Sequence, residues 1–386
     1  MRRLATIRKI DSIEEIAGAD SICLVHIDGW QCVAKKNEFK KDDLCIYFEI
    51  DSILPDKPCF DFMRSRKFRV KTIKCMKQLS QGLALPLSIL SDFNLNPKDY
   101  QSYVSIGTDL TDLLNVKKHD PEAEKESFKR VVKEKPWYQK LLGKIPYLGK
   151  WLFKKKGATE YPSHIVSKTD EERFQNASNG MKECFVNMPF DVTEKVDGTS
   201  TTFIYKPGSF FTKETFMVCS RNFLKHIEDD SWWWTIARKA DIYNKMKKLH
   251  SDMKLTKNTY LVLQGETISP AIQKNKYKVK DYDFYLFNVK LVTGDQTTEY
   301  SPSQIEDLKD IYKLDMKTVP LLATNVIVTS VEELNEYIKN RDFGIKSRVN
   351  ENVVAEGFVV RLQNQNVTKF KSFKFINPEF LLKHEE

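Results

Sequence analysis

The group best suited to covalent chemistry is the lysine in the segment TEKVDGTS. Lys195 lies between the expected end of a strand and a turn at Asp197-Gly198. A lysine amine is a weak nucleophile at its ordinary pKa of about 10.4, but burial or a neighbouring cation lowers that pKa and exposes the lone pair. Asp197 is placed to hold a metal ion or its waters near the same phosphate. Alone, this short pattern is more typical of a solvated lysine on a turn, so Lys195 needs partners elsewhere in the chain.

Such partners follow in the second half of the sequence, each beside an expected strand. They offer carboxylates for a divalent metal, cations for phosphates and an aromatic ring for a base, which together are what nucleotidyl transfer requires. Each also has a structural interpretation, as half of a surface ion pair, a core aromatic or a turn residue. The candidates are Arg221 in CSRN, Glu266 in LQGET, Phe287 in DFYLFNV, Glu356 in AEGFVVR, and Lys371 and Lys374 in KSFKFIN.

The composition limits what such a site can serve. Lysine and arginine (62) exceed aspartate and glutamate (53) in the 386 residues, giving a formal charge of +9. This charge is compatible with a polyanionic partner or phosphate-rich substrate, and equally with a solvated basic surface. The seven cysteines show no CxxC pair or zinc spacing, which predicts reduced thiols. Without a secretory signal or a membrane-length apolar run, we expect a soluble, intracellular, cytoplasmic protein.

Three blocks of different composition divide the chain. Residues 1–115 alternate short apolar runs with charged turns, and Asp28-Gly29 between two runs is a hairpin signal. This spacing predicts a small β-barrel or sandwich, of which we favour an OB-like β-barrel. Residues 116–160 form a basic aromatic linker or insertion. Residues 161–386 mix β-like runs with helical patterns, so we expect an α+β domain long enough for one nucleotide-sized cleft.

Two aromatic segments have competing interpretations. Residues 136–156 combine aromatic side chains with lysines, which fits a surface for RNA or a membrane face. Because Pro136 and Pro146 interrupt any long helix, we favour an interdomain segment whose aromatics pack on a neighbour. The three tryptophans at 232–234 suit stacking on RNA, but we favour the apolar face of a helix packed on the catalytic sheet.

Taken together, the segments resemble the covalent nucleotidyltransferase superfamily of RNA ligases, DNA ligases and mRNA capping enzymes. KVDG, SRN, QGET, FYLFNV, EGFVVR and KSFKFIN resemble its nucleotidyltransferase motifs in order. The finer resemblance is to ATP-dependent RNA ligases with an N-terminal OB domain (the Deinococcus and Naegleria type). WQCVAKKNEFKKDDLCIYFEIDSILP looks like their first domain, while SPAIQKNKY and SFKFINPEFLLK look like their later segments. The chain ends twelve residues after Lys374, where DNA ligases and capping enzymes typically continue into another OB domain, and this favours RNA ligase.

The resemblance implies a fold and a role for each residue of the nucleophilic centre. The catalytic (adenylyltransferase) domain would be a nucleotidyltransferase domain of ATP-grasp-like antiparallel sheets with flanking helices. Lys195 would attack the ATP α-phosphate, releasing pyrophosphate and leaving a lysyl-AMP phosphoramidate. Asp197, Glu266 and Glu356 would hold Mg²⁺ or Mn²⁺, directly or through waters, and Glu266 is an alternative contact for the ribose.

The remaining candidates are assigned to the nucleotide by the same resemblance. Phe287 would stack on adenine, the Glu194 backbone would read the base edge, and Arg221 would bind the ribose or the substrate phosphate. Lys374 would neutralise the α-phosphate and help to lower the pKa of the nucleophile. Viral relatives usually show KxK in the last motif, whereas an isoleucine takes the second position here, so Lys371 is the alternative second cation.

The resemblance finally implies a reaction in three steps. The enzyme is adenylylated, AMP moves to a 5′-phosphate RNA end, and a 3′-OH attacks the activated end and expels AMP. We therefore expect an ATP-dependent RNA ligase acting in RNA repair, a monomer whose N-terminal barrel either holds RNA ends or braces the catalytic domain. The alternatives are a DNA ligase, an mRNA capping guanylyltransferase, or a non-catalytic RNA-binding protein with a decayed ligase domain.

Overall fold

The computed structural model contains two units, each with its own core. One unit joins Met1–Ser127 to Pro378–Glu386, and the other is Phe128–Asn377. This division differs from the expected domains because helix α10 (Pro378–His384), with Phe380 and Leu381 buried, groups with the N-terminal unit. The aromatic and basic segment at 120–158 lies outside the described residues. Those residues are 3–93, 104–119, 159–210, 212–227, 231–340, 346–364 and 370–384.

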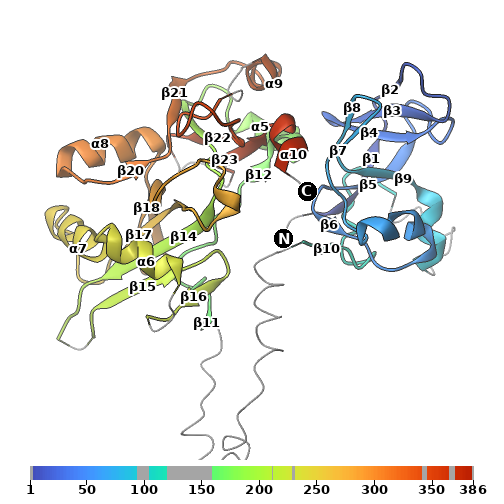
Figure 1. Ribbon diagram of the computed structural model, residues 1–386. Coiled ribbons are helices and arrows are strands. Elements are labelled where there is room, and N and C mark those ends of the chain that lie inside the picture. The colour runs from blue at the N-terminus through green and yellow to red at the C-terminus, as the bar shows by residue number, and fades with distance from the viewer. Residues whose placement is uncertain are drawn as a thin grey trace, which may run out of the picture. The chain divides into compact units, whose positions relative to one another are not determined.

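Among the described residues, the N-terminal unit contains short antiparallel strands, two 3₁₀ helices and helix α10 (Figure 1). Strands β1, β5 and β9 form one sheet and β2, β3 and β4 another, while β7 pairs with β8 and β6 with β10. Their bounds are β1 (Ala5–Lys9), β2 (Ser12–Glu15), β3 (Ile22–Ile27), β4 (Trp30–Lys35), β5 (Leu44–Phe48), β6 (Ser52–Ile53), η1 (Pro58–Arg66), β7 (Ile73–Cys75), β8 (Gln78–Ser80), β9 (Leu83–Pro86), η2 (Leu87–Phe93) and β10 (Lys117–Lys118).

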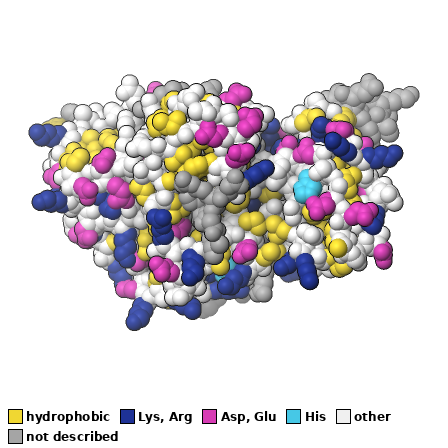
Figure 2. All heavy atoms as spheres, turned by 90° about the horizontal axis from the view of Figure 1, so that it is seen from above, with side chains coloured by type: hydrophobic (Ala, Val, Ile, Leu, Met, Phe, Trp, Pro, Cys, Tyr) yellow, Lys and Arg dark blue, Asp and Glu magenta, His cyan; other side chains and the backbone are white. Residues whose placement is uncertain are grey.

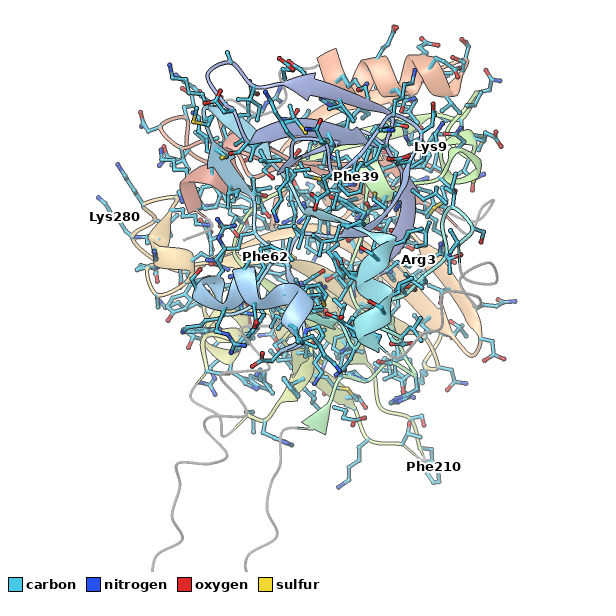
Figure 3. All side chains as sticks on the ribbon, turned by 90° about the vertical axis from the view of Figure 1, so that its right-hand side faces the viewer. Arg3, Lys9, Phe39, Phe62, Phe210 and Lys280 are labelled. Atoms are coloured by element: carbon cyan, nitrogen blue, oxygen red, sulfur yellow. The ribbon has the colours of Figure 1, made fainter. Side chains whose placement is uncertain are left out.

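The predicted hairpin at Asp28-Gly29 is confirmed. Ile27 pairs with Trp30 across a two-residue turn, and both turn residues have positive φ (48° and 83°), as tight hairpins require. The core of this unit is apolar and includes Phe60 on η1, which is fully buried. Phe62, on the same short helix, is 55% exposed (Figure 3).

The second unit contains two sheets and most of the helices (Figure 1). One sheet has the order β11-β16-β15-β14-β17-β18-β19, with β20 also on β18, and the other has the order β12-β23-β22-β13-β21. The strands are β11 (Thr159–Glu160), β12 (Glu172–Arg173), β13 (Phe190–Glu194), β14 (Thr199–Lys206), β15 (Thr215–Cys219), β16 (Phe223–Lys225), β17 (Tyr260–Ile268), β18 (Asp283–Thr293), β19 (Gln296–Glu299), β20 (Lys317–Thr318), β21 (Leu321–Val326), β22 (Gly357–Leu362) and β23 (Ser372–Ile376). The helices are η4 (Phe174–Asn176), α5 (Asn179–Glu183), α6 (Trp232–Lys239), α7 (Ile242–Asp252), η5 (Gln273–Asn275), α8 (Pro302–Tyr312) and α9 (Val331–Asn340).

Alternation along the strands explains how the larger sheet is covered. On β14, Phe203 and Tyr205 pack with residues of α6, α7 and α8, while Ile204 points to the opposite face and packs with Tyr161. Trp233 and Trp234 are buried in the helical layer. The interpretation of these tryptophans as the apolar face of a helix is therefore confirmed.

The structure confirms the expected α+β architecture of this unit and reports several finer features. The helical pattern after residue 230 divides into α6 and α7 at Asp241, whose φ of 49° cannot continue a helix. None of the helices among the described residues is long and apolar enough to cross a membrane. Basic and acidic side chains are interspersed over the face seen in Figure 2, so the excess of positive charge does not by itself mark a binding surface there.

Candidate active site

The candidate nucleophile lies directly after a fully buried strand. Strand β13 ends at Glu194, and the Lys195 N–H donates to the Gly357 carbonyl at 2.9 Å, which fixes the backbone where the chain leaves the sheet. The Lys195 Nζ lies 2.6 Å from Glu356 Oε1. As expected, Glu356 immediately precedes a strand, β22. The structure thus brings the predicted nucleophile and one predicted carboxylate into direct contact.

A tight turn leads from Lys195 to strand β14 of the eight-stranded sheet. The Gly198 N–H donates to Glu266 Oε1 at 3.0 Å, and a Cβ at position 198 would lie 2.4 Å from the Thr267 carbonyl oxygen. Only glycine permits this approach to β17. Glu266 lies two residues before the end of β17, close to the predicted strand end. The requirement for glycine at the last position of the KVDG motif is therefore steric. The hydrogen bond to Glu266 holds the turn in place.

Electrostatics at this centre correct one expectation. Burial alone would lower the pKa of Lys195, but the nearby carboxylates of Glu356, Glu266 and Asp197 outweigh burial and raise that pKa. Lys374 was expected to help lower it. Instead the Lys374 Nζ lies 3.0 Å from Asp170 Oδ1, so its charge is paired with another carboxylate. In this state the nucleophile is protonated.

The carboxylates respond to burial in the opposite direction. Burial raises the pKa of Glu266 to about 8, although the Lys195 charge opposes the shift. Burial likewise raises the pKa of Glu356. Its second oxygen, Oε2, is buried and has no hydrogen-bond partner among the described residues. A buried carboxylate oxygen in that condition suits a cation or an ordered water.

The three expected metal-binding carboxylates face one amine but do not form a direct coordination cluster. Among the described residues, no group of three His, Cys, Asp or Glu side chains is arranged to hold a metal ion. Asp197 instead forms an ion pair with Lys276. Of the two arrangements expected for Asp197, Glu266 and Glu356, the structure therefore lacks the one in which all three ligate an ion directly.

The loop after β17 supplies contacts that the sequence did not single out. Besides the Lys276 pair, the Asp197 N–H donates to Tyr277 Oη at 2.9 Å, and Gln273 Nε2 donates to the Gly198 carbonyl at 3.2 Å. Tyr277 is 4% exposed, and burial raises the pKa of its hydroxyl. These residues belong to SPAIQKNKY, whose only signal in the sequence was its resemblance to a ligase loop. Three contacts from this loop thus hold the turn that follows Lys195.

Phe287, the expected base-stacking residue, lies at an irregularity in strand pairing. Gln264 pairs with Asn288 and Gly265 with Leu286, so Phe287 is the extra residue of a β-bulge. Bulges redirect side chains and are common beside active sites. Phe287 is half-buried against a small cluster that includes Val196, the neighbour of the candidate nucleophile. The structure thus places this ring next to the lysine segment rather than in the main core.

Glu194 has a structural role that limits the expected base contact. Its N–H donates to the Pro320 carbonyl at 2.8 Å and is therefore not available to a base edge. Its buried carboxylate accepts hydrogen bonds from the Ser347 hydroxyl and from the Arg348 N–H. Burial raises the pKa of this carboxyl against the lowering effect of those donors. The Glu194 N–H is thus occupied in this structure, and the expected contact of the Glu194 backbone with the base edge stays a prediction.

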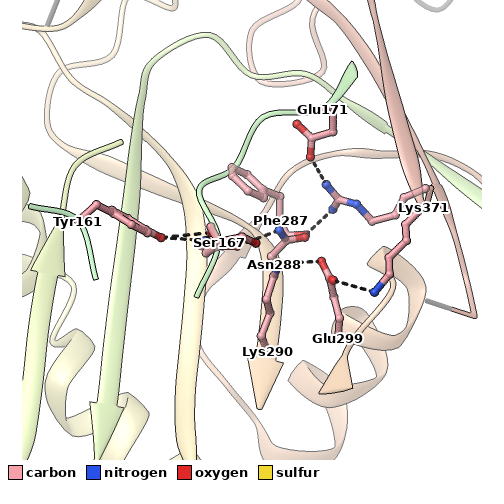
Figure 4. Close-up of polar contacts among 10 residues, drawn as sticks. Tyr161, Ser167, Glu171, Phe287, Asn288, Lys290, Glu299 and Lys371 are labelled. Atoms are coloured by element: carbon pink, nitrogen blue, oxygen red, sulfur yellow. Dashed lines mark hydrogen bonds and ion pairs between the residues drawn. The ribbon is translucent and has the colours of Figure 1, made fainter. Parts of the chain in front are cut away.

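The two candidate lysines of the last motif belong to different clusters. Lys374 is paired with Asp170, which also pairs with Arg221 at 2.8 Å. Lys371 lies 3.7 Å from Glu299, whose other oxygen lies 3.1 Å from Lys290 (Figure 4). Arg221 follows β15, as expected. The structure therefore groups Lys374 with Arg221 and separates Lys371 from them.

A buried arginine, Arg361, links the expected base-stacking residue Phe287 to Glu171. Arg361 on β22 is 3% exposed; its Nη1 donates to the Phe287 carbonyl at 2.9 Å and its Nη2 lies 2.6 Å from Glu171 (Figure 4). Burial would raise the pKa of Glu171, but the charges of Arg361 and Lys374 outweigh it and lower that pKa. Arg361 belongs to the EGFVVR motif, but nothing in the sequence indicated a role for it. It fixes the backbone of the bulged residue.

Comparisons with known proteins agree with this fold and show the family of the chain. A family model of an OB-fold domain matches residues 4–87, and a model of the RNA ligase family matches residues 188–376. A mutant of Naegleria gruberi RNA ligase bound to ATP and Mn is 31% identical, with a TM-score of 0.72 over 100% of both chains. The same ligase with pyrophosphate is 30% identical, with a TM-score of 0.73 over 100% of this chain and 99% of that chain. No curated protein sequence gave a significant match.

The chain therefore belongs to the RNA ligase family. The predictions of an N-terminal OB fold, of an α+β catalytic domain and of RNA ligase rather than another nucleotidyltransferase are confirmed. The roles of the individual site residues stay predictions.

Proposed function

We propose that this RNA ligase uses ATP to join a 3′-OH RNA end to a 5′-phosphate RNA end, with AMP carried on Lys195. The observation that supports this most strongly is the position of Lys195 among the carboxylates of Glu356, Glu266 and Asp197. The similar Naegleria ligase has been observed with ATP and Mn, with AMP and Mn, and with pyrophosphate. These molecules are the substrate, the transferred group and the leaving group of lysine adenylylation.

The first chemical step requires a neutral amine. Lys195 Nζ attacks the α-phosphorus of ATP, a nitrogen–phosphorus bond forms, and the bond from that phosphorus to the bridging oxygen breaks to release pyrophosphate. The proton that the carboxylates hold on Lys195 must leave before attack. The Glu356 carboxylate, 2.6 Å from Lys195 Nζ, is placed to accept that proton.

A divalent cation fits this centre through the carboxylates. Glu356, with one buried oxygen lacking a partner, and Glu266 and Asp197 nearby, would hold Mg²⁺ or Mn²⁺ with waters in between. When bound, the ion supplies positive charge that neutralises the carboxylates, favours the neutral amine and offsets charge on the phosphate oxygens.

The remaining proposed roles follow the positions of the side chains. Phe287, exposed in part beside the lysine segment, stacks on adenine. Arg221 and Lys374 bind phosphate oxygens, first of ATP and then of the RNA 5′ end. Lys371 lies beside Glu299 instead, so we do not propose that it binds these phosphate oxygens. AMP passes from Lys195 to the RNA 5′-phosphate, and the 3′-OH then displaces AMP to form the new phosphodiester.

The direct test is covalent labelling. The protein is incubated with α-labelled ATP and Mg²⁺ or Mn²⁺ and then run on a denaturing gel. We expect wild type to retain label, Lys195→Ala to retain none, and Lys248→Ala, which changes an exposed lysine in a helical ion pair, to match wild type. Label that is absent from wild type or unchanged in Lys195→Ala contradicts the proposal. So does label from GTP that exceeds label from ATP.

The substrate is tested with nicked duplexes that carry RNA or DNA on each side of the break. Sealing that requires RNA at the 3′-OH side supports the proposal, and sealing of all-DNA nicks alone contradicts it.

We further propose a monomeric, cytoplasmic enzyme of RNA repair whose N-terminal unit contacts the RNA. The seven free cysteines support a reducing compartment, and OB barrels commonly bind nucleic-acid strands.

A further inference from the structure

The segment of residues 167–173, here called the strap, connects the two sheets of the catalytic unit. It runs from the chain after β11, in the eight-stranded sheet, into β12, in the five-stranded sheet. Successive side chains contact different motifs: Lys168 Nζ donates to Asn222 Oδ1 at 3.1 Å, and the hydroxyl of Thr169 lies 3.1 Å from that of Ser200. Neighbouring residues of the strap therefore contact segments that are far apart in the sequence.

Asp170, at the middle of the strap, bridges two of the proposed phosphate-binding cations. Its Oδ2 lies 2.8 Å from Arg221 Nη2, and its Oδ1 lies 3.0 Å from Lys374 Nζ. Arg221 comes from the turn after β15 and Lys374 from β23, so the cations belong to different sheets. One carboxylate thus connects the two sheets through their positive groups, with one oxygen for each.

A carboxylate between Arg221 and Lys374 offsets the repulsion between their positive charges. Two cations held close together repel each other, and the repulsion moves them apart unless negative charge lies between them. Arginine has five N–H donors and lysine three, so an ion pair with one carboxylate oxygen does not by itself occupy all the donors of either side chain. The bridge is therefore a means of ordering Arg221 and Lys374 that is compatible with anion binding.

The flanking residues make the position of Asp170 precise. On one side, Glu171 pairs with the buried Arg361 at 2.6 Å, and Arg361 also holds the Phe287 carbonyl. On the other side, the Ser167 carbonyl accepts a hydrogen bond from the buried Gln264 at 3.1 Å (Figure 4). The strap is thus anchored at both ends, and the same segment that orders the cations is tied to the backbone of the base-stacking residue.

We propose that Asp170 is a positioning residue of the ligase, which holds Arg221 and Lys374 at one fixed separation for phosphate binding during adenylyl transfer. The inference rests on the proposed roles of those two cations. The role proposed for Asp170 is exerted through its ion pairs with these two cations, and not through contact with the nucleophile or the nucleotide. Its contribution is to the rate of the chemical step, because misplaced cations still attract ATP but no longer match the charge that develops on its phosphates.

The experiment measures single-turnover adenylylation of Lys195 over a range of ATP concentrations. For Asp170→Asn we expect the maximal rate to fall about 10- to 100-fold, with the half-saturating ATP concentration changed by less than about threefold. Asp170→Glu, which keeps the charge, should recover part of the loss. Asp281→Asn, which removes an aspartate from the exposed ion pair with Lys239, is the matched control and should label like wild type.

A double-mutant cycle separates positioning from simple loss of stability. If Asp170 acts through Lys374, Asp170→Asn should add little to the defect of Lys374→Ala, whereas independent effects multiply. Multiplicative effects, or Asp170→Asn and Asp170→Glu both labelling at the wild-type rate, overturn the inference. Wild-type protein that takes no label refutes the proposed function instead, so the two failures are distinguishable.

Discussion

Replacing Tyr277 by phenylalanine isolates one hydrogen bond that holds the nucleophile turn. Tyr277 Oη accepts from the Asp197 N–H at 2.9 Å, and the tyrosine is 4% exposed. Phenylalanine keeps the ring and creates no cavity, so the change removes the acceptor and little else. The Asp197 N–H, two residues after Lys195, is left without that partner.

The magnitude follows from the energetics of buried hydrogen bonds. A typical intramolecular hydrogen bond contributes about 0.5–1.5 kcal/mol net, and leaving a buried donor unsatisfied costs about 1–3 kcal/mol. Asp197 is half-buried, so a loss of about 1–2 kcal/mol is expected. If this loss falls on the position of Lys195 in the transition state, adenylylation slows by roughly 5- to 30-fold, because each 1.4 kcal/mol corresponds to about tenfold.

Two measurements check this prediction. The first is the single-turnover rate of AMP transfer from α-labelled ATP, and the second is the urea midpoint of unfolding. Tyr243→Phe is the control, because the Tyr243 hydroxyl also forms a hydrogen bond, which it donates to Glu214 at 2.6 Å, and Tyr243 lies on a helix with no proposed catalytic role. An adenylylation rate for Tyr277→Phe equal to that of the control would show that the loop does not position the nucleophile.

Two further predictions concern stability. Gly357→Ala should destabilise the catalytic unit by about 3 kcal/mol or more, since φ is +149° and a Cβ would lie 2.0 Å from the Phe375 carbonyl oxygen; an unchanged urea midpoint would contradict this. Burial lowers the pKa of His250 below 6.5, so the unfolded chain takes up the proton first: stability should be complete above about pH 6.5 and decline as the pH falls below it. His250→Gln should reduce that decline in pH-dependent urea titrations, and an identical pH profile would exclude His250 as its source.

The strands that carry the site could be predicted because their patterns are local. The β-like runs STTFIYK and TYLVLQGET predict two strands, and the structure contains them as β14 and β17, which are antiparallel neighbours. The order of Lys195, Glu266 and Glu356 was readable for the same reason, because each lies beside such a strand. Chemistry carried by strand ends is therefore visible in one sequence.

The contacts that complete the site could not be predicted, because they join distant residues without a local pattern. Asp170 and Lys374 are 204 positions apart, and Glu171 and Arg361 are 190 apart. Nothing in the letters SKTDEER distinguishes a bridging aspartate from a solvated one. The same limit explains the error over the pKa of Lys195, whose direction depends on distances to three carboxylates rather than on the presence of a lysine in the last motif.

The grouping of α10 with the N-terminal unit has a consequence for how the protein is made. The catalytic unit occupies residues 128–377, between the two segments of the other unit. At about 5–20 residues per second, a ribosome needs roughly 10 to 50 s to pass through that stretch. The first 127 residues of the N-terminal unit are made before this stretch, and α10 is made after it. Contacts between α10 and the rest of its unit can therefore form only after the catalytic unit has been synthesised, so assembly of the N-terminal unit spans the synthesis of the catalytic unit.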